Sequence, residues 1–316
     1  MKRMKTAGYF GLALAFFYVT LPVNAMGGKE TAGRTIEELK PVVAVSIQPQ
    51  AYFVQRLAAG RLEQLTLVGP GQSPHSYEPT PRQMADLSRA LVWFTTGVEF
   101  ENALLPKISS LYPGMRIIDT TQGIRFRSME AHGHDDEEDD HEDDDHDDDD
   151  DDEPGSRDPH VWLGRDSVKV QVGHILAGLS SIDPEGASQF LANHDDFIRE
   201  IDTLFDGLAK DLASLRGKPV FVFHPAFGYF LDEFGIIQEA VETGGKEPTQ
   251  KALATLIEEA RKDGARTIFV QAQFPSNAAK SVASAIGGSV IEIDPLAEDW
   301  GNNLKIMAEA LRSSVR

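Results

Sequence analysis

The 316-residue sequence contains no cysteine. Disulfide bridges, cysteine-ligated zinc, iron–sulfur clusters, thiol catalysis and lipid attachment to an N-terminal cysteine are therefore excluded. Familiar catalytic motifs are missing too, because the chain has no HExxH, no GxSxG, no Walker A loop and no complete GxGxxG pattern. The enzyme classes that these motifs define are not indicated.

A basic surface is the second thing that the sequence lacks. Of the 50 acidic residues, 18 lie between Glu130 and Glu153, where there is no Lys or Arg, and the other 32 nearly balance the 30 basic residues. The formal net charge of -20 is therefore concentrated in one tract. Without the basic stripe that nucleic-acid binding needs, we expect no nucleic-acid partner.

Only one long apolar run occurs, and it lies at the N-terminus. Three basic residues among the first five precede an apolar stretch at 7–23, which ends in Val23-Asn24-Ala25. This pattern is typical of a secretory signal peptide cleaved after Ala25. An uncleaved anchor is the alternative, but glycines and Pro22 interrupt a run that is already short for a span of ~20 residues. We expect an exported, soluble mature chain.

The mature sequence alternates β-branched runs with segments of helical periodicity, which predicts an α/β fold with mostly parallel sheets. Strands are predicted at 42–47, 65–68, 91–95, 116–119, 219–223, 267–270 and 290–293. Helices are predicted at 51–59, from Thr80, and at 100–110, 168–179, 183–215, 249–262 and 302–311.

These elements divide the chain into five parts. The signal peptide is 1–25 and a flexible leader is 26–40. An N-terminal α/β lobe at 41–182 is followed by a linking helix at 183–215 and a C-terminal α/β lobe at 216–316. At roughly 150 residues per domain, the length suits two lobes.

The acidic tract, 130–153, interrupts the first lobe. Its Asp, Glu and His residues cannot bury enough apolar surface to fold by themselves, so we predict a disordered loop. It holds four of the nine histidines, His132, His134, His141 and His146. Two interpretations stay open: a segment that binds metal weakly near a cleft, or a solvated charge run that keeps the protein soluble.

Three other histidines share one kind of position. His75, His160 and His224 each adjoin a proline and lie beside a predicted strand end or helix start. Ligands of open α/β sheets bind beyond the carboxyl ends of strands, so we expect the three imidazoles to converge on one cleft. A hydrogen-bonded structural role is the alternative for each, and it is the preferred interpretation for His174 and His194 within helical segments.

Asp294 is a fourth candidate, because it follows the last predicted strand in Ile293-Asp294-Pro295-Leu296. An Asp before a proline is often only a turn former. Alone, this position is a weak indication of a site.

Four segments match a known family in the same order along the chain: GPGQSPHSYEPT at 69–80, DPHVWL at 158–163, FHPAFGY at 223–229 and DPL at 294–296. Together they resemble the periplasmic zinc-binding proteins of ABC transporters, the ZnuA-like branch of the metal-specific solute-binding family. The resemblance covers nearly the whole mature chain. It implies two α/β lobes joined by a long linking helix, a metal site in the interlobe cleft, and a His- and acid-rich loop that the acidic tract matches.

Carried over by position, the resemblance implies that His75 and His160 are metal ligands from the first lobe and that His224 is a ligand from the second. Asp294 matches a position where many relatives supply a carboxylate, while some zinc-binding relatives use water or another acid, so the fourth ligand stays open. Manganese-binding relatives place a carboxylate where this chain has His224. Imidazole suits zinc, and carboxylate suits manganese. The cysteine pair of some zinc-binding relatives is absent.

The resemblance therefore implies a carrier and not an enzyme. We expect a monomeric periplasmic protein that captures Zn2+ as its transported ligand and delivers it to an ABC permease. One alternative is the same carrier tuned to manganese or iron, against which the third histidine argues. Another is an exported zinc hydrolase, because three protein ligands and an open position is also a catalytic design. The missing general-base motif argues against that alternative.

Overall fold

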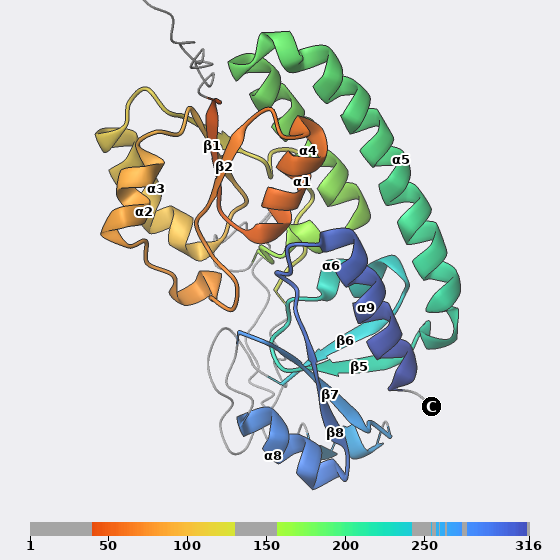
Figure 1. Ribbon diagram of the computed structural model, residues 1–316. Coiled ribbons are helices and arrows are strands. Elements are labelled where there is room, and N and C mark those ends of the chain that lie inside the picture. The colour runs from red at the N-terminus through yellow and green to blue at the C-terminus, as the bar shows by residue number, and fades with distance from the viewer. Residues whose placement is uncertain are drawn as a thin grey trace, which may run out of the picture. The chain divides into compact units, whose positions relative to one another are not determined.

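Two four-stranded parallel sheets organise the chain (Figure 1). The structure is a computed structural model, and it describes residues 40–129, 157–241, 264–273 and 277–314, together with a few positions between 254 and 262. The predicted α/β class with mostly parallel sheets is confirmed. The signal peptide, nearly all of the leader and the acidic tract lie outside the described residues.

The first sheet has the strand order β2-β1-β3-β4. Its inner strands are buried at every position, since helices pack against the sheet, and Ala44 pairs with Leu65 on one side and Trp93 on the other. The strands are β1 (Val42–Val45), β2 (Glu63–Thr66), β3 (Val92–Thr95) and β4 (Arg116–Asp119). The helices are α1 (Gln48–Ala58), α2 (Pro81–Leu87), α3 (Glu99–Leu111) and α4 (Arg165–Ile182).

The second sheet repeats this order as β6-β5-β7-β8. Side chains of β5 alternate between its faces: Val220 and Val222 join the main core, while Phe221 lies in a separate cluster with residues of α8. The strands are β5 (Pro219–Val222), β6 (Ile237–Ala240), β7 (Thr267–Gln271) and β8 (Ser289–Ile293). Within the described part of this lobe, the helices are α6 (Gly228–Glu233), α8 (Asn277–Ile286) and α9 (Trp300–Ser313).

A long helix connects the two sheets. The segment consists of the short turn η3 (Pro184–Gly186), the 25-residue helix α5 (Ala187–Asp211) and the turn η4 (Ala213–Leu215). The buried side chains of α5 recur at helical spacing and pack against α1, α4 and α9, so one helix contacts elements of both lobes. They are Phe190, Phe197, Ile201, Phe205 and Leu208.

Among the strands and α-helices that the structure describes, three were not predicted, and all lie in the second lobe. β6 is an edge strand with polar Gln238 and Glu239 in its centre, α6 has only six residues, and α8 is rich in Ala and Ser. A strand with a polar centre, a helix of under two turns and a helix of small residues are hard to recognise by periodicity in a single sequence. β2 also begins two residues earlier than predicted. Among the described residues, no helix combines the length and the apolar character that crossing a membrane requires.

Candidate metal centre

The three histidines singled out by the sequence lie together. The ring nitrogens that His75, His160 and His224 offer as ligands are all within 4.8 Å of one another. The ring centroids are 4.8 Å apart for His75 and His224, 5.2 Å for His160 and His224, and 6.0 Å for His75 and His160. Loops from both sheets thus bring the imidazoles to one point.

His75 lies in the short helical turn η1 (Pro74–Ser76), between β2 and α2. The Ser73 hydroxyl accepts a hydrogen bond from the His75 amide at 3.3 Å and caps this turn. The end of the loop is fixed by α2, where Thr80 and Gln83 form a capping box and the Gln83 side chain donates to the Leu67 carbonyl. His75 keeps 26% of its side chain exposed, and its Nδ1 lies 3.5 Å from a carboxylate oxygen of Glu99.

His160 is buried and held by Asp158. The Asp158 Oδ1 atom accepts from the His160 backbone amide at 2.9 Å and lies 2.7 Å from His160 Nδ1. A carboxylate at Nδ1 places the proton there and leaves Nε2 as the candidate ligand atom, an arrangement common among metal-binding histidines. Burial alone would raise the pKa of Asp158, but the interactions with His160 and Arg127 outweigh it and hold that pKa below its usual value.

His224 follows β5, separated from it by Phe223. The Phe223 amide donates to the Phe269 carbonyl on the neighbouring strand at 2.7 Å, and the Ala226 amide donates to the His224 carbonyl at 2.8 Å. This second hydrogen bond tightens the chain at His224-Pro225-Ala226. The His224 side chain, 2% exposed, is therefore carried by a loop anchored to the inner strands of the second sheet.

The donor set fits a small divalent cation that favours nitrogen. Two nitrogens bound to one zinc at ~2.0–2.1 Å in tetrahedral geometry lie roughly 3.4 Å apart. The observed spread of up to 4.8 Å requires only small side-chain movements to reach that spacing. The adjoining cavity, lined by His75, His160 and Trp162 among others, has about 10 Å³. This is about the space of one water, so the site suits an ion and not an organic ligand.

Asp294 is not in the cluster that the three histidines form among the described residues. Its Oδ1 accepts hydrogen bonds from Gln273 Nε2 at 2.7 Å and from the Leu296 amide at 2.8 Å. The turn-forming role that the sequence left open is thus present. Because Gln273 and Leu296 also line the small cavity, Asp294 lies behind the wall of the site.

Two tryptophans join the lobes beside His160. Trp162, whose ring centroid is 5.2 Å from that of His160, donates from Nε1 to the Pro295 carbonyl at 2.9 Å. Trp300 Nε1 in turn donates to the Trp162 carbonyl at 2.7 Å. Both indoles are buried, so these cross-lobe hydrogen bonds are shielded from water. They tie the loop of His160 to the loop of Asp294.

His174 and His194 lie outside the cluster, in keeping with the structural roles preferred for them. His174 Nε2 lies 2.8 Å from the Gln122 carbonyl, and His194 Nδ1 lies 3.0 Å from Asp195 Oδ1. The four histidines of the acidic tract lie outside the described residues.

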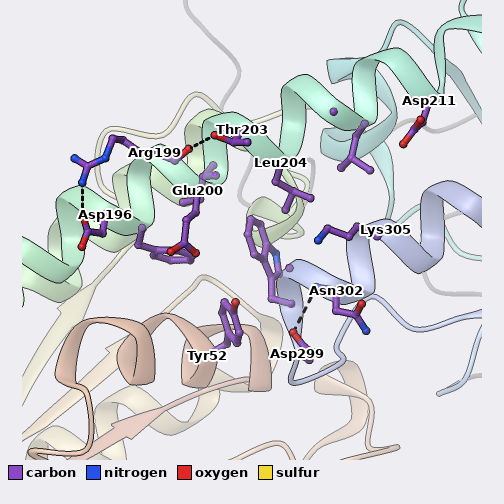
Figure 2. Close-up of a pocket in the computed structure, with 16 residues that line it drawn as sticks. Tyr52, Asp196, Arg199, Glu200, Thr203, Leu204, Asp211, Asp299, Asn302 and Lys305 are labelled. Carbon is purple, nitrogen blue, oxygen red and sulfur yellow. Dashed lines mark hydrogen bonds and ion pairs between the residues drawn. The ribbon is translucent and has the colours of Figure 1, made fainter.

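A larger cavity, about 770 Å³, lies between α1, α5 and α9 and holds none of the histidines (Figure 2). Its polar residues bond to one another and to nearby backbone: Arg199 pairs with Asp196, and Asp299 Oδ1 accepts from the Asn302 amide at 3.4 Å. The cavity and the histidine cluster are therefore different places on the molecule.

Sequence reasoning gave no role to several residues around the site. Asp158 lies two residues before a candidate ligand, a spacing that could have marked it as an orienting group, but its contact with His160 depends on the turn that follows. Glu99, Arg127 and Gln273 are far from the histidines in sequence, and no local motif marks them.

Two parallel sheets joined by one long helix, with clustered imidazoles from loops of both, define a solute-binding protein for metal ions. A family model described as "zinc-uptake complex component A, periplasmic" matches residues 43–314. The chain belongs to this family. Its members are solute-binding proteins of metal uptake systems, so the prediction that the chain is not an enzyme is confirmed.

Individual relatives and solved structures are similar over most of the chain. The high-affinity zinc uptake system protein ZnuA of Brucella abortus (strain 2308) is 28% identical over 295 residues, which cover 86% of this chain and 88% of the relative. A crystal structure of a ZnuA deletion mutant with zinc bound is similar at 31% identity, with a TM-score of 0.77 and coverage of 87% of this chain and 98% of that chain. The protein FpvC of Pseudomonas aeruginosa, solved with Mn2+, shares the fold at 21% identity and a TM-score of 0.69, over 88% and 97% of the two chains.

Proposed function

We propose that the chain captures Zn2+ in the periplasm through His75, His160 and His224, with Asp294 as the candidate fourth ligand, and delivers it to the permease of an ABC transporter. The observation that carries this proposal is the convergence of three imidazoles from two lobes within 4.8 Å. Zinc is favoured over manganese because nitrogen ligands suit zinc and oxygen ligands suit manganese. The zinc-bound ZnuA relative supports the same choice.

Zn2+ is the transported ion in this proposal, so the site has to bind the ion tightly and also release it. Glu99 lies beside His75 and Asp158 beside His160, and these carboxylates favour a divalent cation in a place where His160 and His224 are almost completely buried. His75 is the most exposed of the three. It is the ligand through which an ion would most readily leave the cluster.

Export by cleavage after Ala25 and a monomeric state complete the proposal. Both rest on the sequence and the family. Mass spectrometry of the N-terminus and light scattering of the purified protein test them. A chain that keeps residues 1–25 would indicate an uncleaved anchor, and a dimer would contradict the monomer.

The proposal is tested by metal analysis of protein purified from the periplasm. We expect one tightly bound zinc per chain, displaced little by excess manganese, and loss of that zinc in His160→Ala. His194→Ala, which removes an imidazole outside the cluster, is the matched control and should keep its zinc. Stoichiometric manganese or iron in place of zinc would favour the alternative carrier. Zinc-dependent hydrolysis in a substrate screen would favour the exported hydrolase.

A further inference from the structure

Arg127 connects the loop of His160 to the helix that follows His224. Its Nη1 atom donates to Asp158 Oδ2 at 3.1 Å, and its Nε atom donates to Asp232 Oδ2 at 2.6 Å. The other carboxylate oxygen of Asp158, Oδ1, lies 2.7 Å from His160 Nδ1. Asp232 belongs to α6 in the second lobe, which begins four residues after His224. A single guanidinium thus spans the two lobes immediately behind two candidate ligands.

Hydrogen bonds of the main chain and of the Tyr229 hydroxyl also connect Arg127 to Asp158. Tyr229 accepts a hydrogen bond from the Arg127 amide at 2.9 Å and donates its hydroxyl proton to the Asp158 carbonyl at 3.1 Å. Burial raises the pKa of Tyr229 to about 12, so the hydroxyl keeps its proton at neutral pH. The Asp158 amide also donates to the Arg127 carbonyl at 2.9 Å. The three residues therefore hold one another through main-chain and side-chain groups.

Gly228 leaves the space that the guanidinium fills. A Cβ atom built at this position would lie 1.6 Å from Arg127 Nη1 and 2.3 Å from its Cζ. Both distances are far below any van der Waals contact, so a side chain here would displace the guanidinium. A glycine at the first position of α6 is in this way part of the same arrangement.

Burial separates this ion pair from the others on the surface. The Asp158 side chain is 0% exposed and that of Arg127 is 17% exposed. Exposed ion pairs contribute little, but loss of one partner from a buried pair leaves a desolvated charge that disturbs its surroundings. Here the disturbed group would be the carboxylate that orients His160.

We propose that Arg127 is a positioning residue of the metal site, which sets the distance between His160 and His224 by holding Asp158 from one side and α6, through Asp232, from the other. The inference rests on the proposed function. Groups that orient the ligands of a metal commonly change its affinity 10- to 100-fold when they are removed. We therefore expect Arg127→Met to weaken zinc binding by about that factor and to speed its release.

The test compares Arg127→Met with Arg56→Met by competition titration against a chromogenic chelator. Arg56 is the matched control, since its guanidinium binds Glu200 across α1 and α5, away from the histidines. Gly228→Ala should reproduce the loss seen in Arg127→Met, because it expels the same guanidinium. The double variant should be no weaker than either single one. Additive losses would show that the two residues act separately and would overturn the inference.

A purely structural role is distinguished by two further readouts. The visible absorption of Co2+ bound in place of zinc reports the ligand geometry, and we expect it to change in Arg127→Met while the thermal unfolding of the metal-free protein stays near that of Arg56→Met. If Arg127→Met fails to fold, Asp232→Asn provides the same test on a carboxylate that is 54% exposed. Unchanged zinc affinity and Co2+ spectrum in the folded variant would overturn the inference. Absence of zinc binding by the wild-type chain would overturn the proposed function as well.

Discussion

β1 and β5 hold the same position in their sheets, yet the chain that follows them differs in chemistry. Beyond β1 lies Ser46, fully buried, whose hydroxyl accepts from Trp93 Nε1 at 3.1 Å and whose amide donates to Gln50 Oε1 at 3.0 Å. Beyond β5 lies His224, one of the three clustered imidazoles. One strand end carries a structural network and the other carries a candidate ligand.

The network of the first lobe continues to Glu101. This buried carboxylate accepts from the Thr96 amide at 2.9 Å and the Gly97 amide at 2.8 Å, just beyond β3. Its partners are strand ends of its own lobe. The carboxyl end of a parallel strand thus permits a site, and the residue placed there decides whether one forms.

The largest effect on zinc affinity is expected at His224, the only histidine in the sequence of the second lobe. His224→Ala should weaken zinc binding by several kcal/mol out of the ~10–16 kcal/mol typical of structural zinc sites, or at least about 1000-fold. A competition titration with a chromogenic chelator measures this, with His194→Ala as the control. Retention of tight zinc by His224→Ala would remove the distinction between the two strand ends.

Glu101, in the network of the first lobe, should affect stability and not zinc binding. Burial raises the pKa of Glu101 to about 7, from 4.5. The folded state therefore holds this proton more tightly than the unfolded state, and its contribution to stability, present below pH 4.5, is lost as pH rises through 7. The shift corresponds to about 3 kcal/mol.

Glu101→Gln should remove this pH-dependent loss, because its amide does not ionise; it keeps one of the two acceptor oxygens that receive the Thr96 and Gly97 amides. The free energy of unfolding should then decrease less between pH 5 and pH 8 in Glu101→Gln than in the wild type, by up to about 3 kcal/mol. Denaturant unfolding at several pH values measures the difference. Parallel profiles for wild type and Glu101→Gln would show that Glu101 is ionised throughout.

A smaller effect is expected at Asp294. Its Oδ1 is already bound to Gln273 and Leu296, so Asp294→Ala should disturb the wall of the site and cost roughly 10- to 100-fold in zinc affinity, less than His224→Ala. Asp294→Asn separates charge from hydrogen bonding, because the amide oxygen can still accept from both groups. If Asp294→Ala proves more damaging than His224→Ala, the carboxylate is the stronger ligand and our ranking is wrong.

The smallest effect on the tight site is expected from deletion of the acidic tract, 130–153. His75, His160 and His224 all lie outside it, so one tight zinc per chain should survive the deletion while weaker additional sites disappear. Calorimetry on both proteins counts the two classes of site. Loss of the tight site would make the tract the primary receptor.

Sequence reasoning reached the fold class and the histidine cluster because both leave strong local signals. β-branched runs marked the inner strands, and each clustered histidine stands next to a proline at an element boundary. It missed β6, whose polar central residues resemble a loop. The residues that hold the candidate ligands in place could not be predicted either. Arg127 and Asp232, for example, are 105 residues apart and meet only after both lobes have folded.

The zinc dissociation constant of the tract-deleted protein, measured between pH 7 and pH 5, tests the three-imidazole site most directly. Imidazoles must be neutral to coordinate, and the free group has a pKa of ~6.5, so protons compete with the metal as the pH falls. Free carboxyl groups, with a pKa of ~3.9, stay ionised over this range. We expect a steep loss of affinity, with a slope approaching about three protons per metal at the acid end. A nearly flat profile would contradict a site built from His75, His160 and His224.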